Sequence, residues 1–248
     1  MFKQISLADR LANRLARALP RPKMHIEPQR PIVSFTFDDV PETALSNGAR
    51  ILEQFGVRGT FYTAGGLSGR VHDGQPMLAD EGYRELASRG HELGHHTFSH
   101  RSPVRLAGRY RDDLDRNDAF LTTVTDGYAK NFAFPYGLTS PAAQRAVDRR
   151  FRSGRGVLPG INRGPADPGL LLSVEIGGRS EPASLVGWID DAVATPGWLI
   201  YFTHDVKDPP SRYGCPPDLL ERLVGHALET GCEVLTVDAA LDRLEAAP

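Results

Sequence analysis

The sequence is poor in cysteine, in long apolar runs and in net charge, and each shortage excludes a class of protein. Only Cys215 and Cys232 are present in 248 residues; they form neither a disulfide framework nor a CxxC metal site, and they fit a reducing compartment. No run of about 18 apolar residues occurs, so we expect no membrane-spanning helix. The formal net charge of -2 gives no indication of nucleic-acid binding. What is present, 40% hydrophobic and 24% charged residues, is typical of a globular protein with a full core.

The small net charge hides a basic N-terminal segment, because residues 1–23 hold six basic side chains and a single acidic one, Asp9. A four-residue spacing of leucines predicts an amphipathic helix over residues 4–19. Its apolar stripe consists of Leu7, Leu11, Leu15 and Leu19. The adjoining basic face consists of Arg10, Arg14, Arg17 and Arg21. Two interpretations are open: the helix packs on the main domain, or it makes peripheral contact with an anionic membrane through residues 1–23.

The same segment lacks the apolar core and the cleavage site of a secretory signal. We therefore expect a cytoplasmic protein, peripheral at the inner membrane face if the helix binds lipid. The Pro-rich stretch 20–31 ends the helix and predicts a linker. Two parts are expected: residues 1–30, with the helix and linker, and residues 31–248, with the main domain.

From Ile32 onward, short apolar runs alternate with helical patterns. Strands are predicted at 32–37, 59–64, 91–96, 131–134, 151–157, 170–176, 198–202 and 233–237. Helices are predicted at 41–55, 76–89, 104–125, 141–150, 181–194, 218–230 and 238–246. Such alternation predicts an α/β protein with parallel strands, and seven or eight βα units fit a barrel better than an open sheet.

Polar residues follow four of the predicted strands. They are Asp38-Asp39, the cluster from His96 to His100, Tyr136 and His204. Taken alone, the Asp pair could be a helix cap and the histidines a polar turn. In parallel barrels, however, the carboxyl ends of the strands build the active site, so their coincidence favours a site.

The residue types favour metal-assisted hydrolysis. One Asp and two His can hold a divalent metal and leave a position for water. The bound metal lowers the pKa of that water and polarises a carbonyl oxygen. The second Asp can accept the proton from water, and a separate His can protonate a leaving amine.

Four motifs in this order resemble those of polysaccharide deacetylases, the NodB-homology domain of carbohydrate esterase family four. They are Thr-Phe-Asp-Asp (36–39), His-Thr-Phe-Ser-His (96–100), Phe-Ala-Phe-Pro-Tyr-Gly (132–137) and Phe-Thr-His-Asp (202–205). The resemblance covers roughly residues 31–240. It implies a distorted (β/α)7-type barrel, here with an extra N-terminal amphipathic helix. It also implies removal of N-acetyl groups from amino sugars, usually with zinc.

The resemblance implies a role for each matching residue. Asp38 matches the general base, His204 the general acid, and the backbone N–H of Tyr136 the donor to the oxyanion. The metal ligands, for which Zn²⁺ is the expected ion, are Asp39, His96 and His100. His91 is interpreted as structural, and His95 as a group behind the ligands or on the substrate side.

The sequence also departs from the family pattern. Ala133 stands where the family usually has the arginine that orients the base; Arg163 is a candidate replacement, with an ordinary surface arginine as the alternative. Glu175 is the nearest match to the carboxylate that tunes the acid, so we expect it to orient His204. Phe202 replaces a leucine beside the acid, and Val40 a common glycine.

The expected partner is an N-acetylated saccharide: an exopolysaccharide, an oligosaccharide or a lipid-linked precursor. One alternative is another amide hydrolase, either a deformylase of a lipid-linked aminosugar or a ureide or imide hydrolase. The other is a non-catalytic saccharide-binding module. The sequence contains nothing that fixes an oligomeric state.

Overall fold

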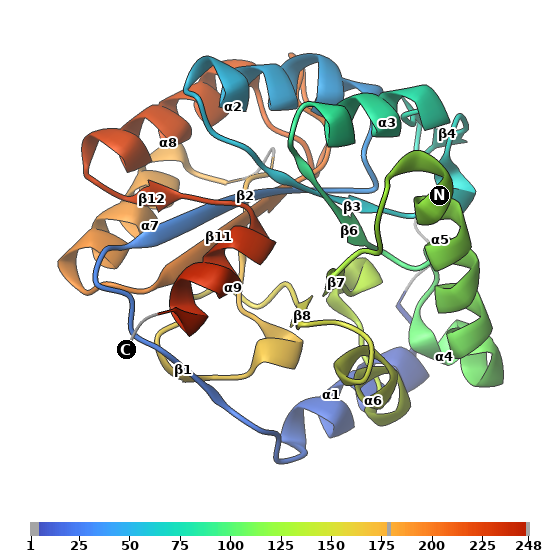
Figure 1. The fold of residues 1–248 in the computed structure, drawn as a ribbon. Helices are drawn as coiled ribbons and strands as arrows, with labels where there is room; N and C mark the ends of the chain where they lie inside the picture. The colour runs from blue at the N-terminus through green and yellow to red at the C-terminus, as the bar shows by residue number, and fades with distance from the viewer. Residues whose placement is uncertain (1–4, 178–179, 247–248) are drawn as a thin grey trace.

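The computed structural model describes residues 5–177 and 180–246, and it contains the predicted α/β barrel in curled, open form (Figure 1). Seven parallel strands follow one another in the order β10-β11-β2-β3-β6-β7-β8, and β12 pairs with the start of β2. The strands of this sheet are β2 (Ile32–Asp38), β3 (Thr60–Thr63), β6 (Glu92–His95), β7 (Asn131–Ala133), β8 (Ser153–Arg155), β10 (Val174–Glu175), β11 (Trp198–Thr203) and β12 (Glu233–Val234).

Most helices lie on the outside of the curled sheet, as expected for βα units, and the last one covers the amino ends of the strands. They are α1 (Leu7–Ala18), α2 (Arg50–Gln54), α3 (Asp80–Ser88), α4 (Pro103–Leu106), α5 (Tyr110–Val124), α6 (Pro141–Asp148), α7 (Pro182–Ala194), α8 (Pro217–Glu229) and α9 (Val237–Glu245). Short helical turns are η1 (Ala44–Ala49), η2 (Gly65–Leu67), η3 (Ala107–Arg109), η4 (Pro135–Gly137) and η5 (Pro168–Leu170).

Strands β2 and β11 are neighbours inside the sheet, with a further strand on either side of the pair, and every residue in both is buried. This is why their sequences are continuous apolar runs rather than alternating patterns. Phe37 of β2 stacks on Phe61 of β3 with ring centroids 4.6 Å apart. The rigid central strands therefore give a fixed platform to the residues that follow them.

The strands of the parallel sheet match the predicted ones, but the structure adds short antiparallel strands in segments predicted as linker or loop. In the expected linker, β1 (Met24–Ile26) pairs with β9 (Gly164–Ala166), which lies between the strands predicted at 151–157 and 170–176. Ile26 is fully buried, so the linker segment packs against the barrel. A hairpin of β4 (Val71–His72) and β5 (Gln75–Pro76) lies after the strand predicted at 59–64, and Pro76, predicted as the first residue of a helix, belongs to it. The predicted division near residue 30 stays a prediction.

The predicted N-terminal helix is present as α1, which begins after a capping box of Ser6 and Asp9. It packs against α4 and α6. Residue 4, where the helix was predicted to begin, and Lys3 lie outside the described residues. No helix in the described part of the chain is both long and apolar enough to cross a membrane.

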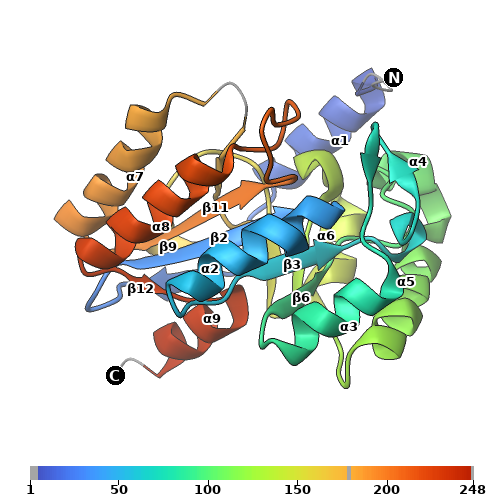
Figure 2. The same ribbon diagram turned by 90° about the horizontal axis from the view of Figure 1, so that it is seen from above.

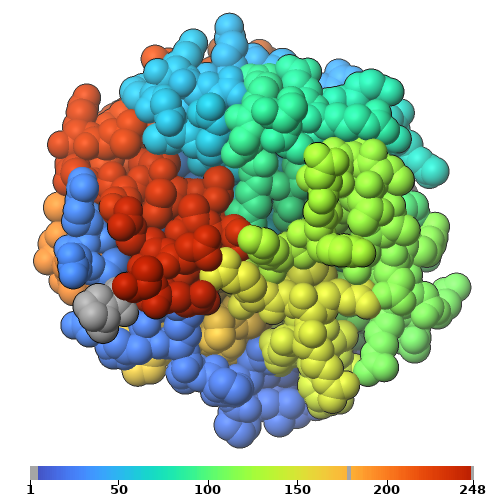
Figure 3. All heavy atoms as spheres, in the orientation of Figure 1, coloured from blue at the N-terminus to red at the C-terminus, as the bar shows by residue number. Residues whose placement is uncertain are grey.

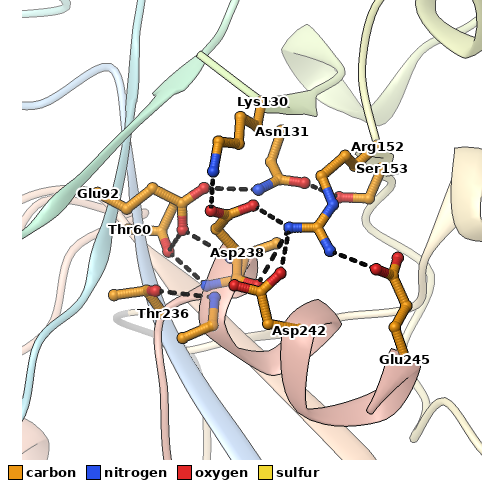
Figure 4. Close-up of polar contacts among 12 residues, drawn as sticks. Thr60, Glu92, Lys130, Asn131, Arg152, Ser153, Thr236, Asp238, Asp242 and Glu245 are labelled. Atoms are coloured by element: carbon orange, nitrogen blue, oxygen red, sulfur yellow. Dashed lines mark hydrogen bonds and ion pairs between the residues drawn. The ribbon is translucent and has the colours of Figure 1, made fainter. Parts of the chain in front are cut away.

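The amino ends of the strands are covered by α9. Figure 3 shows this face filled by side chains, with residues of α9 meeting those around β7 and β8. Beneath them, Glu92 of β6 accepts hydrogen bonds from the Thr60 hydroxyl, the Asn131 amide and the Asp238 backbone N–H (Figure 4). Arg152 forms ion pairs with three carboxylates of α9, namely Asp238, Asp242 and Glu245. This end is closed by polar contacts, which leaves the carboxyl ends of the strands for the site.

Candidate metal centre and catalytic cleft

The carboxyl ends of β2, β7, β10 and β11 and the loop after β6 surround a cleft of about 980 Å³. All seven site residues predicted from the sequence line it: Asp38, Asp39, His96, His100, Tyr136, Glu175 and His204. The barrel thus brings together residues that are up to 166 positions apart in the chain.

Three side chains converge on one point in this cleft. Asp39, His96 and His100 offer ligand atoms that all lie within 4.8 Å of one another. The Nε2 atoms of His96 and His100 lie 3.6 and 3.1 Å from Oδ1 of Asp39. All three residues are buried, and one carboxylate with two imidazoles is a common donor set for a divalent cation.

The backbone holds each ligand in place. Nδ1 of His96 lies 2.8 Å from the Ala133 carbonyl oxygen, which can only accept; the ring therefore donates from Nδ1, and the lone pair of Nε2 faces Asp39. The turn that carries His100 is fixed by Asp113, whose carboxylate accepts hydrogen bonds from the backbone N–H groups of Phe98 and Ser99. Asp39 and His100 both have φ in the left-handed region, at 61° and 49°. Such backbone strain is typical of functional sites.

The electrostatics of the three residues fit a bound cation. Burial lowers the pKa of His96 to about 4 and that of His100 to about 3, so both imidazoles are neutral and able to coordinate at neutral pH. Burial raises the pKa of Asp39, and its Oδ1 accepts no hydrogen bond from the described residues. A buried carboxylate oxygen without a donor is costly, and a cation held by Asp39, His96 and His100 would remove that cost.

Asp38 has a different partner, which the sequence analysis missed. An NH2 group of Arg155 lies 2.5 Å from both carboxylate oxygens of Asp38, and both side chains are buried. Burial alone would raise the pKa of Asp38, but the charge of the Arg155 guanidinium and its hydrogen bonds to the carboxylate hold that pKa below its usual value. Asp38 is therefore ionised at neutral pH, as a base must be.

Of the two interpretations of Arg163, the structure confirms the ordinary surface arginine and not the replacement. Its guanidinium lies 3.4 Å from the carboxylate of Asp191 on α7, at the surface and not among the residues that line the cleft. The replacement for the missing arginine is Arg155 on β8, whose Cα pairs in register with that of Ala133 on β7. The arginine that contacts Asp38 is therefore one strand away from position 133, at the same level of the sheet. One indication was present in the sequence, since Arg155 is a charged residue near the end of a predicted strand.

His204 lines the same cleft, close to the three ligands. Its Nε2 is 3.9 Å from Oδ2 of Asp39, and its ring contacts that of Tyr213, with centroids 5.4 Å apart. The loop after it is fixed by Asp205, a fully buried residue that accepts hydrogen bonds from the backbone and hydroxyl of Ser211. His204 is partly exposed, so it can reach both the cleft and solvent.

Glu175 and Tyr136 occupy other parts of the cleft wall. No hydrogen bond joins Glu175 to His204 among the described residues, although the nearby His204 charge opposes the rise that burial causes in the pKa of Glu175. Its orienting role stays a prediction. Tyr136 has a left-handed φ of 60°, and its hydroxyl donates to the His100 carbonyl oxygen at 3.3 Å.

The two remaining histidines of the cluster face away from the cleft. His91 is buried, accepts a hydrogen bond from the Gly59 N–H and contacts Glu53 at 3.0 Å, which fits its structural interpretation. His95 packs between Phe132 and Phe151 with no exposed surface. The substrate-side alternative for His95 is therefore wrong, because an apolar cluster encloses its ring.

The family model for polysaccharide deacetylases matches residues 25–150. The chain belongs to the polysaccharide deacetylase family. The matched residues include Asp38, Asp39, both histidine ligands and Tyr136, so the part of the chain that carries the metal centre is the part that the family shares. No curated protein sequence matches the chain.

Solved structures agree on the fold. A family 4 acetyl xylan esterase from Clostridium thermocellum, in complex with a cobalt ion, is 23% identical with a TM-score of 0.60, over 88% of this chain and 93% of that one. The peptidoglycan deacetylase PdaC from Bacillus subtilis, in a mutant form, is 16% identical with a TM-score of 0.58, over 88% and 94%. A CE4 family pseudoenzyme from Bacillus anthracis is 18% identical with a TM-score of 0.61, over 91% and 70%.

Proposed function

We propose that this protein is a metal-dependent hydrolase that removes the N-acetyl group from an amino sugar of a saccharide. One observation carries the proposal: the ionised Asp38, paired with Arg155, lies beside the Asp39–His96–His100 cluster in the cleft that His204 also lines. A binding module needs neither a base nor an acid at that place. Because the fold also occurs in a pseudoenzyme, the proposal rests on these side chains and not on the likeness.

Each side chain has a part in hydrolysis. When bound to Asp39, His96 and His100, a divalent cation, for which Zn²⁺ is our expectation, supplies Lewis acidity toward water and the amide carbonyl. Asp38 accepts a proton from the water whose oxygen adds to the amide carbon. The backbone N–H of Tyr136 donates to the oxyanion. His204 then donates a proton to the nitrogen as the C–N bond breaks, which yields acetate and a free amine.

The cleft walls support a saccharide as the substrate. Tyr136 is 50% exposed, and Tyr213 lines the same cleft, so two aromatic rings are available to pack on sugar rings. The volume of about 980 Å³ is at the upper end for small-molecule sites and can take more than one sugar. Phe202 also lines the cleft, and the centre of its ring lies 4.8 Å from the guanidinium carbon of Arg155.

The experiment measures acetate, formate and free amine released from N-acetylglucosamine oligomers by metal-loaded protein and by Asp38→Asn. The amide keeps the size of Asp38 but cannot accept the proton, so release should fall by roughly 10³-fold while bound metal stays at the wild-type level. Glu42→Gln, at an exposed position after the same strand, is the matched control and should keep full activity.

Acetate release that disappears in Asp38→Asn and in chelator supports the proposal. Metal binding without turnover of any N-acyl sugar favours the binding module. Formate release from N-formyl sugars, with none from N-acetyl sugars, favours the deformylase, and turnover of ureides alone would favour that other class of amide hydrolase.

A further inference from the structure

Helix α1 is amphipathic, but its apolar side faces solvent. Leu7, Leu11 and Leu15 are 82%, 67% and 55% exposed, and Leu19 and Ile5 are 41% and 43% exposed. These five account for half of the ten large apolar side chains that are exposed among the described residues. A surface helix normally buries its apolar stripe against its own domain.

Polar contacts hold the helix in this orientation. Asp9 is 2% exposed and accepts a hydrogen bond of 2.6 Å from the Ser102 hydroxyl. Asn13 accepts from the Thr139 backbone N–H at 3.2 Å. After the helix, Arg21 pairs with Asp148 and Asp167. Turning the leucines inward would break these buried contacts, so the barrel itself does not use the apolar stripe.

The surface around the stripe is basic. Arg10 and Arg14 are exposed on α1, and Lys23 is exposed after it. Arg101, just before α4, and Arg105, within α4, are exposed on the segment against which α1 packs. The one acidic residue of the helix, Asp9, is buried, so this face carries cations around leucines although the whole chain has a net charge of -2.

The same face borders the catalytic cleft. Ile5 and Asp9 line the cleft together with Arg101 and Arg105. Figure 2 shows α1 on the same side of the molecule as α4 and the loop that follows β11. Whatever binds the leucines therefore lies close to the entrance that a substrate uses.

We propose that α1 docks the protein on an anionic lipid bilayer, with the leucines of the stripe among the acyl chains and the surrounding arginines at the headgroups. Apolar residues flanked by exposed cations are the pattern of interfacial helices, and anionic lipids add attraction for each basic residue. If the proposed function holds, the substrate is a saccharide presented at that membrane surface, such as a lipid-linked one.

A second copy of the chain is a poorer occupant of this face. A helix of 12 residues is about 18 Å long, so the stripe offers far less than the roughly 800 Å² per partner of a stable dimer. Two copies joined through the stripe would also bring Arg10 and Arg14 close to their own counterparts, which is unfavourable.

The test is co-sedimentation of the full chain with phosphatidylglycerol–phosphatidylcholine vesicles and with phosphatidylcholine alone. Wild type should bind the anionic vesicles, and the triple variant Leu7→Ser, Leu11→Ser, Leu15→Ser should bind at least about tenfold more weakly. Arg10→Gln with Arg14→Gln should lose roughly fivefold per residue and most of the salt dependence. The matched control, Tyr128→Ser, Leu158→Ser, Val193→Ser, removes three exposed apolar side chains outside α1 and should bind like wild type.

Three results would overturn the docking proposal: no binding of wild type to anionic vesicles, equal loss in the control variant, or a concentration-dependent dimer that the leucine variant abolishes. Acetate release from soluble oligomers, measured on the same samples, should be unchanged in the leucine variant, since these leucines lie outside the cleft lining. Vesicle binding without acetate release contradicts the proposed function alone, and acetate release without vesicle binding contradicts the docking alone.

Discussion

Asp38 on β2 and Arg155 on β8 are joined across the barrel by an ion pair. Ala133 and Arg155 are partners on β7 and β8, and both are buried. The small side chain at 133 leaves space that the longer one at 155 fills, beneath Asp38 and against the rings of Tyr62 and Phe202. The Arg155 guanidinium is hydrogen-bonded to the Asp38 carboxylate but does not line the cleft. It therefore fixes the position of Asp38 without touching substrate.

Arg155→Ala should lower kcat by about 10²-fold with little change in KM. Asp38 would lose the hydrogen bonds that fix its position, whereas the cleft residues that bind the saccharide would be unchanged. The double variant Arg155→Ala, Ala133→Arg should recover a large part of kcat, since an arginine at 133 would reach Asp38 from the adjacent strand. Steady-state kinetics with metal content as a second readout check this.

Arg163→Ala is the matched control for that experiment and should behave like wild type. An unchanged kcat in Arg155→Ala, or a double variant no better than the single one, would contradict the positioning role. The sequence predicts that Arg155 lies in a strand, but it does not predict the contact with Asp38. The two residues are 117 positions apart, and the register between β7 and β8 cannot be read from the residues near either strand.

His95 should make stability depend on pH. Burial lowers its pKa to about 3, whereas an unfolded histidine protonates near 6.5. As pH falls below about 6.5 the unfolded state binds the proton first, so stability is complete above this pH and is lost progressively toward pH 3. His95→Gln should be less stable near neutral pH, since it loses packing on Phe132 and Phe151, but its stability should fall by roughly 1.4 kcal/mol less per pH unit.

Urea unfolding at a series of pH values between about 7.5 and 4.5 measures this difference. His25→Gln, at an exposed position in β1, is the control and should follow the wild-type curve. Parallel curves for wild type and His95→Gln would show that another group dominates the acid response.

At the scale of elements, the long apolar runs were predictable and the short strand pairings were not. The short apolar runs that form β2 and β11 strongly favour buried strands over other structures. Strands β1 and β9 have only three residues each and are about 140 positions apart in sequence, so no local pattern predicts their pairing. The orientation of α1 was equally hidden, because its spacing predicts a stripe but the polar partners Ser102 and Thr139 are distant in sequence.

The closed end of the barrel depends on Glu92, which ties α9 to three strands. Its Oε2 accepts from the Thr60 hydroxyl and the Asp238 N–H, at 2.8 and 2.9 Å, while Oε1 accepts from Asn131. In Glu92→Gln, the NH₂ group of the new side chain would face groups that themselves donate hydrogen bonds, so at least one of them would lose its acceptor. The substitution should therefore lower the free energy of unfolding by about 2 kcal/mol. Thermal and urea unfolding measure this loss.

Glu221→Gln, at an exposed position on α8, is the comparison and should change stability little. Activity per folded molecule should be the same in both variants, because the network lies at the opposite end of the strands from the cleft. A Glu92→Gln protein as stable as Glu221→Gln would show that α9 is held by its apolar contacts instead.

At the scale of the whole molecule, the site is a product of the fold. Asp39 follows β2, His96 and His100 follow β6, and His204 follows β11, and the order of these strands in the sheet brings their carboxyl ends together. The ordered motifs predicted this set from sequence, because each motif stands directly after an apolar run. The depth of burial, which leaves both imidazoles neutral and Oδ1 of Asp39 without a donor, required the three-dimensional structure.

The most direct measurement of the central claim is acetate release from N-acetylglucosamine oligomers by metal-stripped protein as Zn²⁺ is added back stepwise. The rate should rise in proportion to Zn²⁺ and stop rising at one equivalent per chain, since Asp39, His96 and His100 form one site. His100→Ala should neither retain the ion nor recover activity. Binding of one equivalent of Zn²⁺ with no acetate released at any occupancy would contradict the account.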